Sequence, residues 1–66
     1  MNKAMIRYQG KYYILTYSYL YRYCTITKND EKFFDAQGSA AEKYLQMIKD
    51  KGEDYTVRLL VDKVTS

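Results

Sequence analysis

The longest segment of the chain without Gly, Pro, Asn or Asp runs from Lys11 to Lys28. It is rich in Tyr, Ile, Thr and Leu, the residues that fit a pleated and half-buried strand. A single strand of this length would exceed the usual range of roughly 3 to 10 residues. The pattern therefore predicts either one strand with a bulge near Thr16–Tyr19 or two strands that join there.

Two shorter segments on either side of this region also have strand character. Met5–Gln9 alternates weakly between apolar and polar residues and meets Gly10, which suits a tight reversal of the chain. After the long segment, Asn29–Glu31 predicts a turn and Lys32–Ala36 predicts a short strand.

The next segment has the pattern of an amphipathic helix over Ser39–Lys51. Ser39 stands three residues before Glu42, which predicts a capping box at the start of the helix. Lysines in the last turn suit the negative end of the helix dipole, and Gly52 is placed to end the helix. The apolar residues that recur on one face are Ala41, Tyr44, Leu45 and Ile48.

The C-terminal segment, Asp54–Val64, alternates between apolar and more polar positions. Such a period of two predicts a long amphipathic strand. The apolar set is Tyr55, Val57, Leu59 and Val61, and the alternating set is Thr56, Arg58, Leu60 and Asp62.

These elements predict one small domain over residues 1–66, in the order β-β-β-α-β. One helix can cover one face of a small sheet, so the fold class is α+β. We expect a twisted, mainly antiparallel sheet of about four strands with the helix packed on one face.

Six of the nine tyrosines lie between Tyr12 and Thr27, and every second residue from Tyr17 to Tyr23 is a tyrosine. In an unbroken strand this row would lie on the sheet face that the helix leaves uncovered. A bulge would reverse the phase for half of the strand and bury some of the rings. The opposite face, which we expect to join the core, would carry Ile14, Leu20, Cys24 and Ile26.

The net charge and the single cysteine bear on which partners and which cellular compartment we expect for this domain. The net charge of +3 is compatible with nucleic acid or acidic proteins as partners but demands neither. Cys24 is the only cysteine, so a disulfide within the chain is excluded, and we expect a small buried hydrophobe. With no export signal and no apolar run of membrane-spanning length, we expect a cytoplasmic protein that is not inserted in a membrane.

The residues that usually carry catalysis are missing or poorly placed. The chain has no histidine, which is the usual general base near neutral pH, and its three glycines are isolated. Two groups of acidic residues fall where turns are predicted, and solvated charge explains them: Asp30 and Glu31 with Asp35, and Asp50 with Glu53 and Asp54. One thiol cannot form a zinc site. We therefore predict no enzyme activity, no cofactor and no bound metal.

The tyrosine row allows three non-catalytic interpretations. It can be a solvated ladder that stabilises the sheet, an interface with a second copy or a foreign protein, or a platform on which bases stack. We predict the protein interface, with a homodimer as one form of it and direct nucleic-acid binding as the alternative. The predicted partner-binding residues are Tyr17, Tyr19, Tyr21 and Tyr23, with Arg22 and Arg7 at the rim.

The predicted order of three strands and a helix resembles, in topology, the small DNA-binding domains of some integrases and the AP2-like domains. In its small size and missing catalytic residues, the chain is similar in style to phage and mobile-element accessory proteins, including anti-CRISPR proteins. The second resemblance implies a small inhibitor or adaptor that covers a surface of a nucleic-acid-handling complex.

Overall fold

The computed structural model describes all residues of the chain, Met1–Ser66. Four strands form one antiparallel sheet in the order β1-β2-β3-β4, and two helices follow them in the sequence. The predicted α+β class and an antiparallel sheet of four strands are thus confirmed, but the predicted order β-β-β-α-β with one helix is wrong, because the observed order is β-β-β-β-α-α. The elements are β1 (Asn2–Tyr8), β2 (Lys11–Ser18), β3 (Tyr23–Lys28), β4 (Glu31–Gln37), α1 (Ser39–Lys51) and α2 (Glu53–Thr65).

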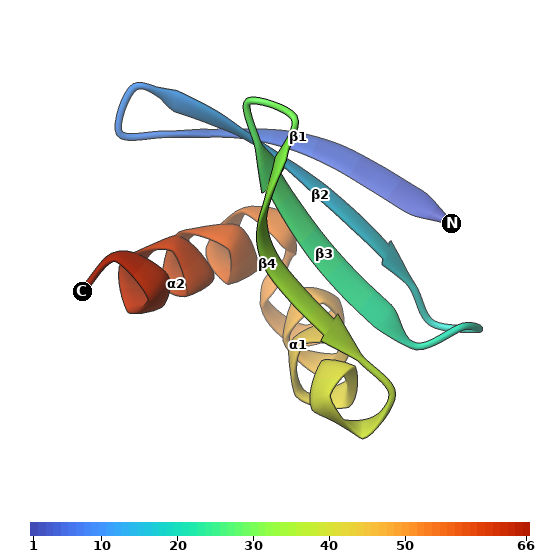
Figure 1. The fold of residues 1–66 in the computed structure, drawn as a ribbon. Coiled ribbons are helices and arrows are strands. Elements are labelled where there is room, and N and C mark those ends of the chain that lie inside the picture. Colours follow the sequence, from blue (N-terminus) through green and yellow to red (C-terminus); the bar gives the residue numbers. More distant parts are fainter.

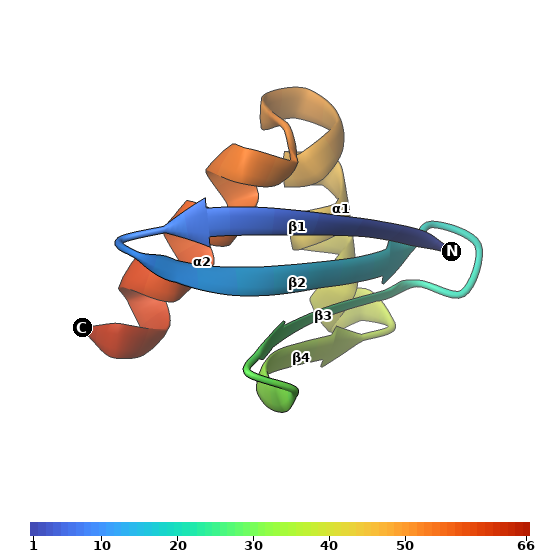
Figure 2. The ribbon, with the colours of Figure 1, turned by 90° about the horizontal axis from the view of Figure 1, so that it is seen from above.

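Both helices lie on the same side of the sheet (Figures 1 and 2). Helix α1 packs against β3 and β4, and helix α2 packs against β1 and β2. The two helices therefore divide one face of the sheet between them. The other face has no covering layer, and it remains available for contacts with other molecules.

Tight turns with left-handed backbone conformations join the outer pairs of strands. Gln9 and Gly10 have φ angles of 54° and 75°, and Asn29 and Asp30 have φ angles of 53° and 64°. Two central residues with positive φ define the type I′ turn, whose twist matches that of the flanking strands. The reversals predicted at Gly10 and at Asn29–Glu31 are confirmed. The long central segment is two strands, joined by residues 19–22 rather than by a bulge.

Strand β4 carries a bulge that brings two aromatic rings to the helix side of the sheet. The register pairs Ile26 with Phe34 and Thr27 with Lys32, so Phe33 is the extra residue. The Phe33 ring meets the Tyr13 ring edge-on at 5.4 Å, and the Phe34 ring meets Tyr44 of α1 at 5.2 Å. The bulge thus lets both phenylalanine rings pack against the core at the β4 edge of the sheet.

Helix α1 spans the predicted residues, but the predicted capping box is wrong. Gly38 occupies the N-cap position, no side chain caps the helix, and the Ala41 amide donates to the Gly38 carbonyl at 3.0 Å. Ser39 is exposed and already lies inside the first turn, so its hydroxyl cannot play the part of an N-cap acceptor. The predicted apolar face is confirmed, because Ala41, Leu45 and Ile48 are buried.

The predicted C-terminal strand is wrong, because Glu53–Thr65 forms a second helix, α2. Its buried residues follow helical spacing rather than alternation, and they are Thr56, Val57, Leu60 and Val61. A single residue, Gly52, separates the two helices at φ 99° and ψ 165°, a region that is essentially restricted to glycine. Gly52 therefore ends α1 as predicted and also redirects the chain into α2.

The phase predicted for the core side of the central strand is also wrong. Tyr13, Leu15 and Tyr17 face the helices and are buried, whereas Ile14 lies on the uncovered face and Leu20 is 80% exposed. Cys24 and Ile26 of β3 are buried, as predicted. The phase reverses between β2 and β3 because the loop at residues 19–22 separates the two strands.

Two neighbouring leucines distinguish the helix from the predicted strand. Leu60 is fully buried, while Leu59 is 36% exposed, and a strand with the predicted phase would bury Leu59 instead. We expect Leu60→Ala to lower the free energy of unfolding by about 2 to 5 kcal/mol, through the cavity it leaves. We expect Leu59→Ala to cost about 1 kcal/mol or less. Chemical denaturation of the two variants measures this difference, and a larger loss for Leu59→Ala would contradict the α2 packing.

Candidate functional site

The loop between β2 and β3, Tyr19-Leu20-Tyr21-Arg22, exposes three large side chains in succession. Leu20 is 80% exposed, Tyr21 is 75% exposed and Tyr19 is 42% exposed. The loop projects from one end of the sheet, the end at which the N-terminus also lies (Figures 1 and 2). Adjacent large apolar side chains in water are a mark of an interaction surface.

The backbone of this loop is fixed at both ends by hydrogen bonds. The buried Ser18 hydroxyl accepts from the Tyr21 amide at 3.1 Å. The Arg22 carbonyl accepts from the Gly38 amide at 2.8 Å, which ties the loop to the start of α1. Arg22 itself adopts a left-handed conformation with φ 53°. An anchored loop loses little conformational entropy when a partner binds to it.

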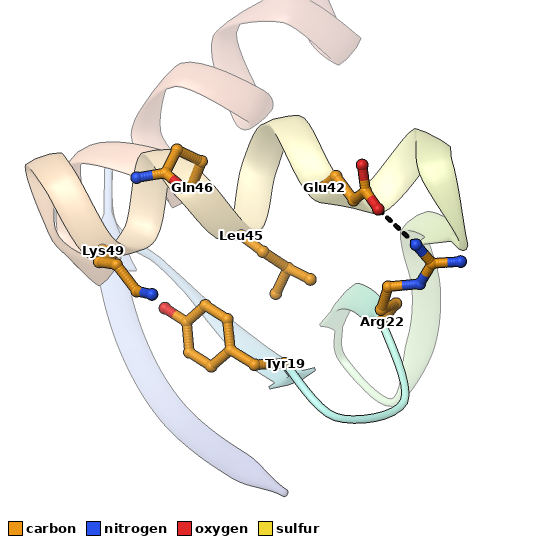
Figure 3. Close-up of a pocket in the computed structure, with 6 residues that line it drawn as sticks. All are labelled: Tyr19, Arg22, Glu42, Leu45, Gln46 and Lys49. Atoms are coloured by element: carbon orange, nitrogen blue, oxygen red, sulfur yellow. Dashed lines mark hydrogen bonds and ion pairs between the residues drawn. The ribbon is translucent and has the colours of Figure 1, made fainter.

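A hollow of about 250 Å³ lies between this loop and the exposed side of α1. Figure 3 shows Tyr19 and Arg22 on the loop side, facing Glu42, Leu45, Gln46 and Lys49 of the helix. The Arg22 guanidinium forms an ion pair with Glu42, and the Lys49 ammonium lies 5.2 Å from the centroid of the Tyr19 ring. The hollow is smaller than typical small-molecule pockets of roughly 300 to 1,000 Å³. Its size and polar walls suit a single side chain of a partner.

The structure separates the residues that the sequence grouped into one partner-binding row. Tyr19, Tyr21 and Arg22 lie together in the loop. Tyr23 is half-buried on the uncovered face of β3, and Arg7 is exposed on the uncovered face of β1. The regular spacing of the tyrosines therefore does not produce one continuous row of rings, because the loop interrupts the alternation.

Tyr17 is a core residue that ties the sheet to α2. Its ring is 7% exposed and meets the Tyr19 ring edge-on at 5.7 Å. Its hydroxyl donates to Oε2 of Glu53 at 2.5 Å. One of the alternating tyrosines is thus buried, an outcome that the sequence left open. Tyr17 supports the loop through the Tyr19 ring and offers little surface of its own.

Burial and nearby carboxylates alter the protonation of several side chains in this region. Burial, and then the hydrogen bond to Glu53, raise the pKa of Tyr17 to about 12. Burial, followed by the charges of Glu53 and Asp50, raises the pKa of Tyr19. Burial and the charge of Asp35 raise the pKa of the Cys24 thiol to about 11. At neutral pH Cys24 therefore holds its proton and is a poor nucleophile.

Three contributors to this site were missed in the sequence. The sequence pattern predicts Leu20 as a core residue, Glu42 as part of a capping box, and Lys49 as a cation that suits the end of the helix dipole. No local signal marks the loop, since residues 19–22 contain none of the usual turn formers. The side-by-side placement of the loop and α1 arises only when the chain folds.

The uncovered face of the sheet forms a second exposed surface. Met5 is paired with Ile14, and Arg7 is paired with Tyr12, whose ring centroid lies 5.6 Å from the Arg7 guanidinium carbon. Met5 and Tyr12 are 65% and 54% exposed. This face combines apolar, aromatic and cationic side chains next to the β1 edge.

No group of three or more His, Cys, Asp or Glu side chains is arranged to hold a metal ion. Neither helix has the length and apolar character needed to cross a lipid bilayer. Comparisons of the chain with protein-family models, with curated proteins and with solved structures found no match. The function therefore has to be argued from the surfaces themselves.

The raised pKa of Tyr17 predicts a loss of stability in alkali. A buried phenol whose pKa lies above the usual value of about 10 favours the folded state while it is protonated. Its contribution is complete below about pH 10 and is lost as the pH rises through about 12. We expect phenolate absorbance to show late-titrating tyrosines, and we expect the component near pH 12 to be lost in Tyr17→Phe and to persist in the exposed control Tyr21→Phe. A titration unchanged by Tyr17→Phe would contradict the buried contact with Glu53.

Proposed function

We propose that this protein is a non-catalytic binding module that covers a surface of a protein partner. The observation that carries the proposal is the anchored loop that exposes Leu20 and Tyr21. In this proposal the loop is the energetic centre of the interface. The hollow beside it receives a side chain of the partner.

The composition of this surface supports a protein partner. Tyrosine and arginine are enriched at binding hot spots because they bring a large, rigid contact area with a polar end. Here Tyr19, Tyr21 and Arg22 are the loop neighbours of the exposed Leu20, and the charged side chains of Glu42 and Lys49 line the hollow beside the loop. Apolar residues at the centre and polar residues around them are typical of protein interfaces.

We propose further that the module is a small inhibitor or adaptor of a nucleic-acid-handling complex, in the style of phage accessory proteins such as the anti-CRISPR proteins. Its net charge of +3 would favour association with a complex that has an acidic surface. We expect it to act in the cytoplasm, where an unpaired thiol such as that of Cys24 stays reduced.

The second candidate function is direct binding of nucleic acid on the uncovered face of the sheet. The arrangement that favours it is Arg7 stacked over Tyr12, because such pairs can contact a phosphate and a base together. Asp35 is exposed on the same face and opposes it, since its charge repels phosphate. A steep dependence of binding on salt would favour this candidate.

We expect Leu20→Ala and Tyr21→Ala each to weaken binding to a protein partner by about 2 kcal/mol, as truncation of a hot-spot residue does. The partner is first captured from a lysate with and without nuclease, and binding of the purified pair is then measured by calorimetry. Thermal melts establish that each variant is folded.

The matched control is Tyr55→Ala, which removes a half-exposed ring from α2 that does not line the hollow. We expect this variant to bind like the parent. If both loop variants also bind like the parent, the loop is not the binding centre. If nuclease treatment removes the captured partner, the result would favour direct binding of nucleic acid instead.

A further inference from the structure

Strand β1 is a regular, open edge of the sheet. It pairs with β2 over its whole length, Asn2–Tyr8, without a bulge, and no strand lies on its other side. In an antiparallel ladder only alternate residues bond to the neighbouring strand. The two-residue turn makes Tyr8 and Lys11 a bonded pair, so the alternate residues Lys3, Met5 and Arg7 direct their backbone amides and carbonyls outward. These groups are a template for another strand.

The opposite edge, β4, lacks this regularity. Its pairing shifts at the bulge where Phe33 has no partner, and Lys32 is paired with Asp35 at 3.6 Å. Bulges twist an edge strand away from further pairing. The sheet therefore has one blocked edge and one that can accept a strand.

The charges along the open edge are all of one sign. The same three residues also place their side chains on the uncovered face. There the exposed Met5 has one cation on each side, Lys3 and Arg7. The first 29 residues hold five Lys or Arg and no Asp or Glu, because all eight acidic residues lie from Asp30 onward. Strands β1 and β2 thus form a cationic, partly apolar platform.

This charge pattern disfavours a second copy of the chain as the added strand. An antiparallel β1–β1 pair centred on Met5 would place Lys3 of each copy opposite Arg7 of the other. Like charges directly opposite one another destabilise a sheet. Pairing of β1 with β4 of another copy would meet the bulge at Phe33. A cationic edge instead favours a partner strand with acidic side chains.

We propose that the β1 edge takes up an extended, acidic segment of a partner protein as a fifth strand. Residues directly opposite each other in an antiparallel pair share a face and lie close together. The segment would therefore carry acidic residues four positions apart, opposite Lys3 and Arg7, and an apolar residue midway, opposite Met5. Backbone hydrogen bonds supply affinity in this mode, and the alternate side chains supply selectivity. The edge is separate from the β2–β3 loop, and it shares with the proposed function only the premise of a protein partner.

The test uses a capped synthetic peptide, Gly-Glu-Thr-Val-Thr-Glu-Gly, and the same peptide with both glutamates replaced by lysine. Amide hydrogen exchange, measured by NMR, reports directly whether the backbone amides of the β1 edge become hydrogen-bonded. We expect the acidic peptide to slow exchange at Lys3, Met5 and Arg7 and to leave Phe33 and Asp35 unchanged. No slowing at saturating peptide, or equal slowing by the lysine peptide, would overturn the proposal.

Charge reversal supplies the matched variants. We expect Lys3→Glu with Arg7→Glu to weaken binding of the acidic peptide by about tenfold or more, because like charges then meet across the pair. Lys63→Glu, an exposed change on α2, is the control and keeps the parent affinity. Equal affinity of the edge variant and the parent would contradict the pairing. Unchanged peptide binding by Leu20→Ala separates this edge from the loop proposed above.

Two further outcomes would assign the edge to another occupant and overturn the proposal. One is a dimer, seen by light scattering without peptide, in which the same three amides are already protected. The other is a single-stranded oligothymidylate that displaces the peptide and leaves these amides unprotected. The first would assign the edge to a second copy, and the second would assign the uncovered face to nucleic acid.

Discussion

The packing of two helices against one face of a four-stranded sheet is the constraint on which the rest of this structure depends. In this chain of 66 residues, both helices pack on the same face of the sheet, and the other face has no covering layer. Strand β2 lies inside the sheet, and its residues Tyr13, Leu15 and Tyr17 supply much of the buried surface. Once these rings face the helices, the opposite face of the sheet and the loop after Ser18 must meet solvent.

Core and surface are connected through Tyr17. Its hydroxyl contacts Glu53 in the first turn of α2, and its ring supports Tyr19, where the exposed loop begins. The Ser18 hydroxyl and the Gly38 amide then fix the loop by hydrogen bonds to its backbone. The same packing that stabilises the fold thus holds Leu20 and Tyr21 in the solvent. An exposed apolar loop of this kind is costly for a monomer that binds nothing, and it is useful for one that binds a partner.

The positive residues of the first two strands and the acidic residues lie in different parts of the chain, and folding therefore places them in different regions of the structure. The strands β1 and β2 carry only cations, and the acidic residues follow in β4, the helices and the turn before β4. On the helix side Asp62 accepts a hydrogen bond from the Tyr8 hydroxyl, so it is engaged beneath the sheet. The open β1 edge keeps its positive charge. In our proposal, its regular backbone and the side chains on the uncovered face contact the same partner strand.

The sequence by itself determined the α+β class, the antiparallel sheet, the turns at Gly10 and Asn29, and helix α1. Each of these depends on local chemistry: glycine and asparagine tolerate positive φ, and an amphipathic helix repeats its apolar residues every three to four positions. Only the tertiary structure decided α2, where Val57 and Val61 satisfy both an alternating and a helical pattern until packing selects Leu60 over Leu59. It also decided which tyrosines are buried, because the break at residues 19–22 reverses the phase without a Gly, Pro, Asn or Asp to mark it.

The candidate site joins a loop and a helix that are 20 residues apart at Arg22 and Glu42. Such a contact is set by the packing of α1 beneath β3, which no local pattern in the sequence encodes.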